Sequence, residues 1–223
     1  GFVMSRQIIC SVGTSLQNNY WTAIGTRSRE IPPVDPVKEW LKTADPAIVS
    51  AETNTLRALE VDDQDKLIFL HSDTPDGEFC AEMLREYYRG KCYAAELEKI
   101  AGLNYHASRF DTGMKSLVDI ALRRIRQARQ DARLPVLCAT GGFQPETAFL
   151  NLLGALLEVE VVYIHERHRE LVTLARLPLS WDTGFALTHR EFFEWIDSEP
   201  PRRRSGELAA RGPCVASAGG IFR

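Results

Sequence analysis

A glycine-rich segment with the chemistry of a phosphate site follows an apolar run near residue 139. Thr140-Gly141-Gly142 precedes Pro145, and proline is typical of the first turn of a helix. Two adjacent glycines leave backbone N–H groups accessible, and a helix N-terminus adds about half a positive charge, so this segment is suited to a phosphate. The same glycines would also suit a tight strand-to-helix turn. Because the segment matches neither the GxGxxG fingerprint nor the lysine-containing phosphate loop, a dinucleotide or P-loop site is not indicated.

Two further segments carry hydroxyl groups directly after apolar runs. Gly13-Thr14-Ser15 offers backbone N–H groups and two hydroxyls to a phosphate or a ribose 2′-hydroxyl, although serine and threonine also commonly cap helices. Ser72-Asp73-Thr74 leads into a Pro-Asp-Gly sequence typical of a turn and helix cap, against which an adenine could pack. Asp73 and Asp76 have no third ligand to complete a metal site. We therefore predict neither a bound metal nor a cofactor.

Cationic side chains follow a fourth apolar run. Arginine forms forked contacts with phosphate, and histidine can transfer protons near neutral pH. Neighbouring Glu166 and Glu170 leave open the alternative of a neutralised, solvated loop. The candidate residues are His165, Arg167, His168 and Arg169. A second arginine series is expected to form the solvent face of a helix; it consists of Arg123, Arg124, Arg126, Arg129 and Arg133.

The elements that would position these segments alternate between strands and helices. Apolar runs predict strands at 7–12, 66–72, 95–100, 134–139 and 159–164. Periodic patterns predict helices at 36–41, 47–59, 78–89, 113–129, 145–157 and 188–196, whereas 171–177 suits either a strand or a short helix. This order predicts an α/β domain with a mostly parallel, Rossmann-like sheet and helices on both faces. Ligands of such sheets bind beyond the carboxyl ends of the strands, so the candidate loops should converge there.

Composition and charge exclude several classes of protein. Hydrophobic residues make up 44% of the 223 residues and charged residues 26%, which is ordinary for a globular protein. No apolar run reaches the roughly 18 residues of a membrane helix, so no membrane partner is expected. The five cysteines form no CxxC pair, which favours reduced thiols in a cytoplasmic protein. Residues 199–223 hold five arginines and two glutamates, so the net charge of −3 leaves −6 on residues 1–198 and argues against binding of duplex DNA.

Three motifs together resemble a CARF (CRISPR-associated Rossmann fold) domain. They are the segments 9–16 (Ile-Cys-Ser-Val-Gly-Thr-Ser-Leu), 70–77 (Leu-His-Ser-Asp-Thr-Pro-Asp-Gly) and 139–146 (Ala-Thr-Gly-Gly-Phe-Gln-Pro-Glu), and the likeness spans about residues 5–164. It implies a homodimer whose cleft binds a cyclic oligoadenylate, usually the tetramer made by type III CRISPR complexes. The residues that this resemblance assigns to the cleft are Gly13, Thr14, Ser15, Asn18, Thr140, Gly141, Gly142 and Gln144.

Some CARF proteins are ring nucleases, which cut the ring without metal. The resemblance then implies that a ligand 2′-hydroxyl attacks the neighbouring phosphate and leaves a 2′,3′-cyclic phosphate. Ser15 would orient the attacking hydroxyl or the phosphate, and a cation would stabilise the developing charge. Related enzymes use lysine for that cation, where this chain offers Arg167, His168 and Arg169, and Gln144 stands where a lysine is common.

The alternative is a sensor that binds the ring without cutting it and controls a fused or partner effector domain. Roughly sixty residues follow Ile164, which is short for an effector, and no arginine–histidine ribonuclease motif is visible among them. We expect a CARF domain at 4–165, an extension of it at 166–198 and a linker or flexible tail at 199–223. A nucleotide-binding protein unrelated to CRISPR is the third possibility.

Overall fold

Six strands form a single sheet in the order β3-β2-β1-β4-β5-β6. All neighbouring strands are parallel except β6, which runs antiparallel to β5. The computed structural model describes residues 4–104, 110–141, 144–164 and 171–174. The strands are β1 (Arg6–Ser11), β2 (Lys66–Ser72), β3 (Ala94–Ile100), β4 (Leu134–Cys138), β5 (Glu160–Ile164) and β6 (Leu171–Thr173).

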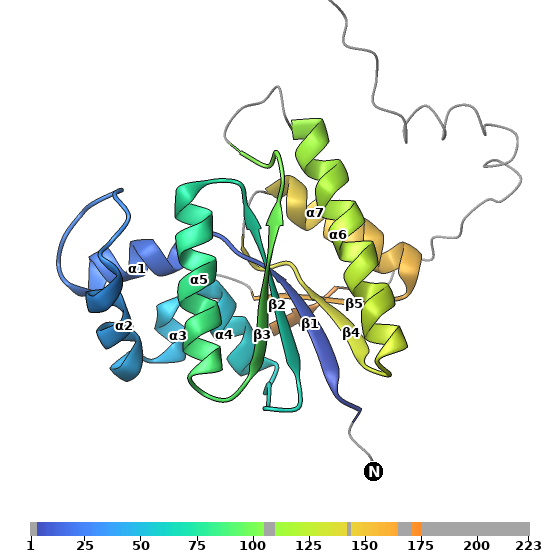
Figure 1. Ribbon diagram of the computed structural model, residues 1–223, viewed down its shortest axis with the longest axis horizontal. Helices are drawn as coiled ribbons and strands as arrows, with labels where there is room; N and C mark the ends of the chain where they lie inside the picture. The colour runs from blue at the N-terminus through green and yellow to red at the C-terminus, as the bar shows by residue number, and fades with distance from the viewer. Residues whose placement is uncertain (1–3, 105–109, 142–143, 165–170, 175–223) are drawn as a thin grey trace, which may run out of the picture. The chain divides into compact units, whose positions relative to one another are not determined.

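Helices cover both faces of the sheet (Figure 1). One core cluster joins the sheet to the first five helices, and a second joins the opposite face to the last two. The first group comprises α1 (Ser15–Ala23), α2 (Val34–Thr43), α3 (Pro46–Val49), α4 (Ala51–Ala58) and α5 (Pro75–Arg89). The second comprises α6 (Phe110–Gln130) and α7 (Gln144–Leu157).

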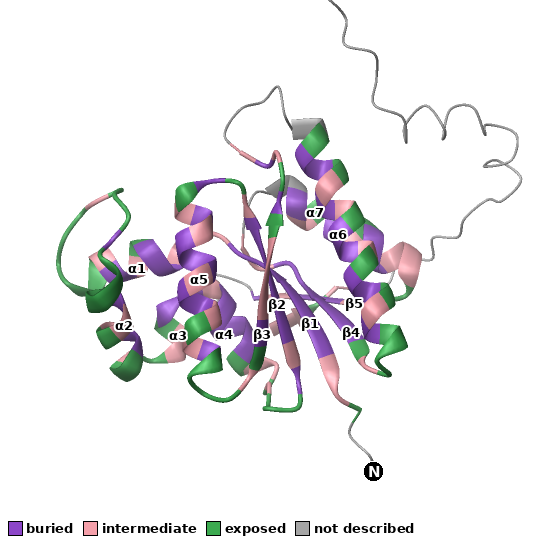
Figure 2. Ribbon diagram, viewed as in Figure 1, coloured by how far each residue is buried: buried purple, intermediate pink, exposed green. Residues whose placement is uncertain are grey.

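The central strands β1 and β2 are buried along almost their whole length (Figure 2). Successive side chains of a strand point to opposite faces, so a strand covered on both faces must be apolar at consecutive positions. On β1, Ile8 packs in the α1–α5 core and Ile9 in the α6–α7 core. The predicted mostly parallel sheet with helices on both faces is therefore confirmed.

Local chemistry accounts for the differences from the predicted elements. The expected helix at 47–59 is two helices, α3 and α4, because Ser50 is extended (φ −158°, ψ 167°) and forms a capping box with Thr53. α1, which we did not predict, begins directly after Thr14. The ambiguous segment at 171–177 begins as strand β6, and its Leu174 N–H donates to the Val161 carbonyl.

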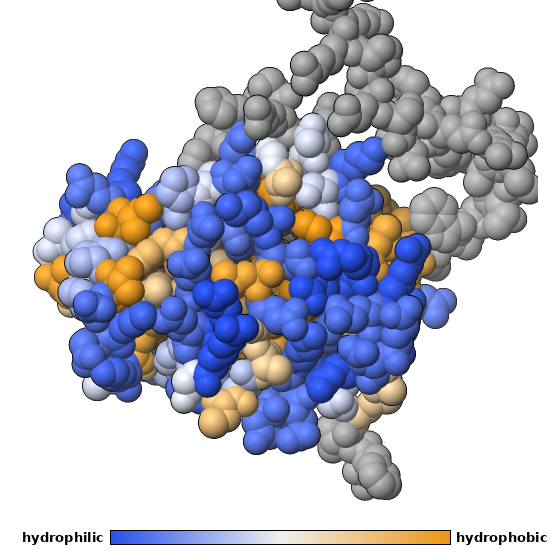
Figure 3. All heavy atoms as spheres, in the orientation of Figure 1, coloured by the Kyte–Doolittle hydropathy of each residue, from blue (hydrophilic) through white to orange (hydrophobic). Residues whose placement is uncertain are grey.

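A network of charges links β3 to α6. Arg124 is only 7% exposed, although the sequence placed it on a solvent face; its guanidinium donates to Glu98 at 2.8 Å and to Glu96 at 2.7 Å. Burial would raise the pKa of Glu96, but hydrogen bonds from Lys66 and Arg124 hold it below its ordinary value. Hydrophilic side chains dominate the surface over α5, β3 and α6 in Figure 3.

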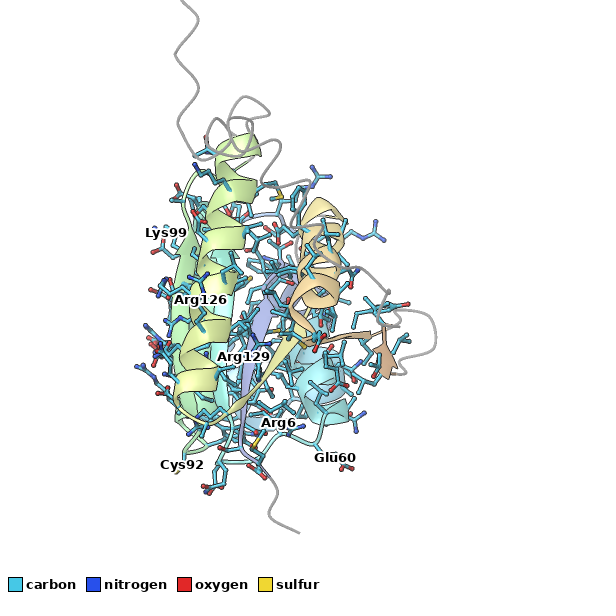
Figure 4. The ribbon with its side chains drawn as sticks, turned by 90° about the vertical axis from the view of Figure 1, so that its right-hand side faces the viewer. Arg6, Glu60, Cys92, Lys99, Arg126 and Arg129 are labelled. Carbon is cyan, nitrogen blue, oxygen red and sulfur yellow. The ribbon has the colours of Figure 1, made fainter. Side chains whose placement is uncertain are left out.

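A second ion pair holds the amino end of β1. The Asp65 carboxylate accepts from the Arg6 backbone N–H at 3.0 Å and from its guanidinium at 2.6 Å. The guanidinium also donates to the carbonyls of Leu59 and Glu60, so it ties β1 to the segment that precedes β2. Figure 4 shows Arg6 and Glu60 at one end of the sheet and Lys99 towards the other.

This pair predicts a loss of stability in acid that depends on Asp65. Burial acts to raise the pKa of Asp65, but hydrogen bonds from Arg6 and Asp62 keep it below the ordinary value of 3.8. A depressed carboxyl pKa stabilises the fold above the unfolded-state pKa, and this contribution is lost as pH falls through the folded-state pKa. We expect Asp65→Asn to cost about 2 kcal/mol at neutral pH and to flatten the decline in stability below about pH 4.

The measurement is the free energy of unfolding from urea titrations between neutral pH and pH 3. Asp63→Asn is the matched control, because Asp63 is an exposed neighbour of the same type. If the free energy of unfolding of Asp65→Asn fell with pH as steeply as that of the wild type, the decline could not be assigned to Asp65.

All described residues lie within one compact unit, residues 1–179. The boundaries predicted at residues 165 and 198 stay predictions. Among the described helices, none combines the length and the apolar character needed to cross a membrane.

Candidate functional site

The strand order creates a switch point between β1 and β4. From β1 the chain adds β2 and β3 on one side of the sheet, and then β4 and β5 on the other. β1 and β4 are parallel and in register, with Cys10 opposite Cys138, so their carboxyl ends lie side by side. In open α/β sheets, the helices diverge at such a point and leave the crevice where ligands bind. The Gly13–Ser15 turn follows one of these strands and Thr140-Gly141 the other.

A buried glutamate lies between these two turns. Glu52 comes from the first turn of α4 and has no exposed surface. Its Oε1 accepts the Gly13 N–H at 2.8 Å, and its Oε2 accepts the Ser15 hydroxyl at 3.2 Å. The expectation of a bare amide at Gly13 is therefore wrong, because a carboxylate of the same chain binds it.

The Ser15 hydroxyl is bound on a second side. Its Oγ accepts the Ala51 N–H, the first backbone donor of α4, at 3.0 Å. Ser15 therefore joins the first turn of α1 to the first turn of α4. Thr14 does stand at the N-cap of α1, as the helix-cap alternative predicts, but its side chain makes no cap hydrogen bond; the Ser15 hydroxyl instead accepts from the first turn of α4.

Close approach, not unusual backbone geometry, explains the glycine at position 141. A Cβ there would collide with Glu52 Oε1 and with the Gly13 nitrogen, and would lie 3.0 Å from the Ser11 carbonyl oxygen. The two turns are thus in contact and form one continuous surface at the carboxyl ends of β1 and β4. Only glycine lets the β4 turn pack against both Gly13 and the Glu52 carboxylate.

The thiols near this site are unsuited to nucleophilic chemistry. A hydrogen bond with Cys138, burial and the negative charge of Glu52 all raise the pKa of Cys10 well above its usual value. Burial, together with Glu52, raises the pKa of Cys80 to about 12. Since the thiolate is the reactive form, neither thiol is an activated nucleophile at neutral pH. Among the described residues of the two turns, the polar groups are hydroxyls and backbone amides, joined by the Glu52 carboxylate, and these can orient a ligand through hydrogen bonds.

The sequence matches a family model described as CRISPR-associated protein (Cas_APE2256) over residues 47–177. The chain belongs to this CRISPR-associated family. The matched region includes Glu52 and Gly141, whereas Gly13 and Ser15 lie before it.

The third candidate loop of this CRISPR-associated protein follows β2, the neighbour of β1. Thr74 caps α5 by accepting the Gly77 N–H at 3.2 Å, and its hydroxyl lies 2.8 Å from that of Ser72. Asp73 is exposed, with a carboxyl oxygen 3.9 Å from Lys99 Nζ. The predicted cap and turn chemistry is therefore present, and contact of this loop with a ligand stays a prediction. The described residues contain no group of three side chains able to hold a metal ion.

The other sequence-based candidates are not all brought to this site. Asn18 is exposed on α1, and Thr140 is half-buried with its hydroxyl 3.6 Å from Cys138 Sγ. Gln144 begins α7, but its side chain is not among those described. The candidates outside the described residues are Gly142, His165, Arg167, His168 and Arg169.

Glu52 is the residue that the sequence reasoning missed. It lies 37 residues after Ser15, within a segment predicted as one long helix. The available signal was local: Ser50 and Thr53 have the spacing of a capping box, which starts a new helix with Glu52 in its first turn.

Proposed function

We propose that this CRISPR-associated protein is a CARF-type, Rossmann-like domain that binds a cyclic oligoadenylate, most readily cyclic tetra-adenylate, in the cleft of a homodimer. It would act in the cytoplasm in type III CRISPR antiviral signalling. One observation carries the proposal: the Gly13–Ser15 and Thr140-Gly141 turns meet at the switch point of the sheet, with Gly141 packed on Gly13. Membership of the CRISPR-associated family supports the biological setting and weighs against the unrelated nucleotide-binding alternative.

We extend the proposal to cleavage of the ring without metal. The 2′-oxygen of one nucleotide bonds to the neighbouring phosphorus, and the bond from that phosphorus to the 5′-oxygen breaks. The proton of the 2′-hydroxyl goes to solvent, and the departing 5′-oxygen takes one up, which gives a linear product ending in a 2′,3′-cyclic phosphate. Such a reaction asks the protein mainly for in-line positioning and charge stabilisation. Ser15 provides positioning, and Arg167, His168 or Arg169 is assigned the cationic role.

The experiment is incubation of the protein with labelled cyclic tetra-adenylate in excess EDTA, with cyclic hexa-adenylate in parallel. Linear products with a cyclic phosphate end support a ring nuclease. Retention of the intact ring supports the second candidate, a non-cleaving sensor of an effector. Two observations favour that candidate: Glu52 already binds the Ser15 proton, and glutamine stands at position 144. If neither ring is retained or cut, the proposed function is wrong.

Ser15→Ala is expected to slow cleavage about tenfold while changing ring affinity by less than about threefold. The alanine removes the oriented oxygen near the reacting centre, whereas the rest of the binding surface persists. Single-turnover cleavage and equilibrium binding are measured on the same preparation. Thr22→Ala, on the exposed end of α1, is the control for loss of a hydroxyl from that helix. Equal losses of cleavage and binding would refute the role given to Ser15.

A further inference from the structure

The hydroxyl of Ser15 has one hydrogen-bonding capacity left. A serine hydroxyl offers one donor and two acceptor lone pairs. Its proton is directed to Glu52 Oε2 at 3.2 Å, and one lone pair accepts the Ala51 N–H at 3.0 Å. Within the part of the chain that the structure describes, these bonds leave one lone pair on Oγ. In this state Ser15 can accept a further hydrogen bond but cannot donate one.

We propose that Glu52 is a positioning residue that orients Ser15 as an acceptor for a ligand hydroxyl. A phosphate diester oxygen carries no proton, so it requires a donor, which Ser15 does not supply while it is bonded to Glu52. The 2′-hydroxyl of an adenylate does carry a proton and can donate it to Oγ. This inference rests on the proposed function, and it selects the attacking hydroxyl, not the phosphate, as the partner of Ser15.

Glu52 is held firmly enough to impose this orientation. Its second oxygen accepts the Gly13 N–H at 2.8 Å, so both carboxylate oxygens are engaged. The helix that carries it is fixed by a reciprocal pair of 3.0 Å bonds between Ser50 and Thr53, and the Thr53 hydroxyl also donates to the Pro46 carbonyl at 2.6 Å. Complete burial gives the carboxylate no alternative partner in solvent.

In the cleavage step, Ser15 aligns the ligand 2′-hydroxyl but does not take up the proton of that hydroxyl. The 2′-oxygen bonds to phosphorus as the bond to the 5′-oxygen breaks, and both proton transfers are with water. Glu52 touches neither the ring nor the reacting atoms; it acts only through Ser15. Its replacement should therefore change which ligand group Ser15 recognises, in addition to the rate.

Glu52→Gln reverses the polarity of this contact with little change in shape. With the amide oxygen of the glutamine on the Gly13 N–H, its NH₂ group faces Ser15 Oγ. Both lone pairs of Ser15 are then occupied, and its proton is free to turn outward. We expect cleavage to slow about tenfold, with ring affinity within about threefold of wild type. Glu39→Gln, 70% exposed on α2, is the matched control and should behave as wild type.

A modified ring tests the contact directly. The probe is cyclic tetra-adenylate with each 2′-hydroxyl replaced by hydrogen, which cannot be cut by this route. We expect this 2′-deoxy ring to bind wild-type protein about threefold more weakly than the natural ring, in line with the small loss expected when Ser15 is removed, whereas Ser15→Ala and Glu52→Gln should bind the two rings about equally. Because each protein is compared with itself on two rings, a general loss of affinity cancels from the ratio.

The possible results separate the two proposals. Wild-type protein that retains neither ring overturns the proposed function and this inference with it. Wild-type protein that binds the natural ring but does not discriminate the 2′-deoxy ring overturns the inference alone, as does Glu52→Gln protein with wild-type discrimination. If Glu52→Gln does not fold, the affinities of wild type and Ser15→Ala for the two rings still test whether Ser15 accepts a hydrogen bond from the ligand 2′-hydroxyl. If the protein binds the ring without cutting it, the same ratios of affinity for the natural and the 2′-deoxy ring are expected.

Discussion

Replacing Gly141 with alanine is expected to lower ring affinity by about tenfold to a hundredfold, because overpacking costs about 1–3 kcal/mol and each 1.4 kcal/mol taken up by the binding surface is tenfold in affinity. The added methyl would collide with Glu52 Oε1 and with the Gly13 nitrogen, and would lie 3.0 Å from the Ser11 carbonyl oxygen. Two of the opposing groups are backbone, so the collision is relieved only if the two turns move apart. We also expect a loss of about 2 kcal/mol in the free energy of unfolding, as in other overpacked sites. Affinity is measured by titration with labelled cyclic tetra-adenylate.

Gly154→Ala separates loss of the site from loss of stability. Gly154 lies in α7, where a Cβ would collide with the Val161 side chain and lie 3.0 Å from the Val159 carbonyl oxygen. This variant should therefore be destabilised to a similar degree, yet bind the ring normally wherever it is folded. Equal loss of affinity in both variants would show that the contact between the two turns has no special part in binding.

Arg124→Met is expected to destabilise the fold by about 3–5 kcal/mol, the largest stability effect that we predict for a single side chain. The variant keeps most of the apolar stem but removes the charge that Glu96 and Glu98 share. Glu98 has a side chain only 16% exposed, so it would be left as a largely buried, poorly compensated carboxylate. Urea denaturation at neutral pH measures the effect.

Arg123→Met is the neighbouring control. Arg123 also reaches Glu98, at 2.9 Å, but its side chain is 57% exposed. Water screens such a pair, so we expect a loss below about 1 kcal/mol. Similar losses for the two variants would mean that burial of Arg124 does not determine the strength of the network.

The part of the fold that could be predicted is the part determined by neighbours in sequence. Consecutive apolar residues in 66–72 indicated a strand covered on both faces, and Pro145 indicated the start of a helix; both are present. Because parallel strands end at a common edge, the convergence of the Gly13 and Gly141 turns also followed from the sequence. These inferences required no knowledge of which helix covers which strand.

The rest depends on contacts between distant segments. The sequence could not show that Glu52 inserts between two turns, because its partners Gly13 and Ser15 lie 39 and 37 residues before it and its helix looked continuous with the one before. Arg124 was expected at the surface for a similar reason: its burial depends on Glu96 and Glu98, which an isolated helix pattern does not reveal. In both cases a charged residue is buried because the groups that hydrogen-bond to it come from another part of the chain.

The central position of β1 constrains how this protein can be made. β1 pairs with β2 on one side and with β4 on the other, and β4 begins about 130 residues later. On a ribosome, the segment ending at β3 can assemble three strands and the helices of one face. The opposite face of the sheet stays uncovered until α6 has been synthesised. Until then Ile9, Ile68 and Leu70, which belong to the core beneath α6 and α7, are uncovered. The nascent chain thus passes through a stage with an apolar sheet surface open to chaperones or to other chains.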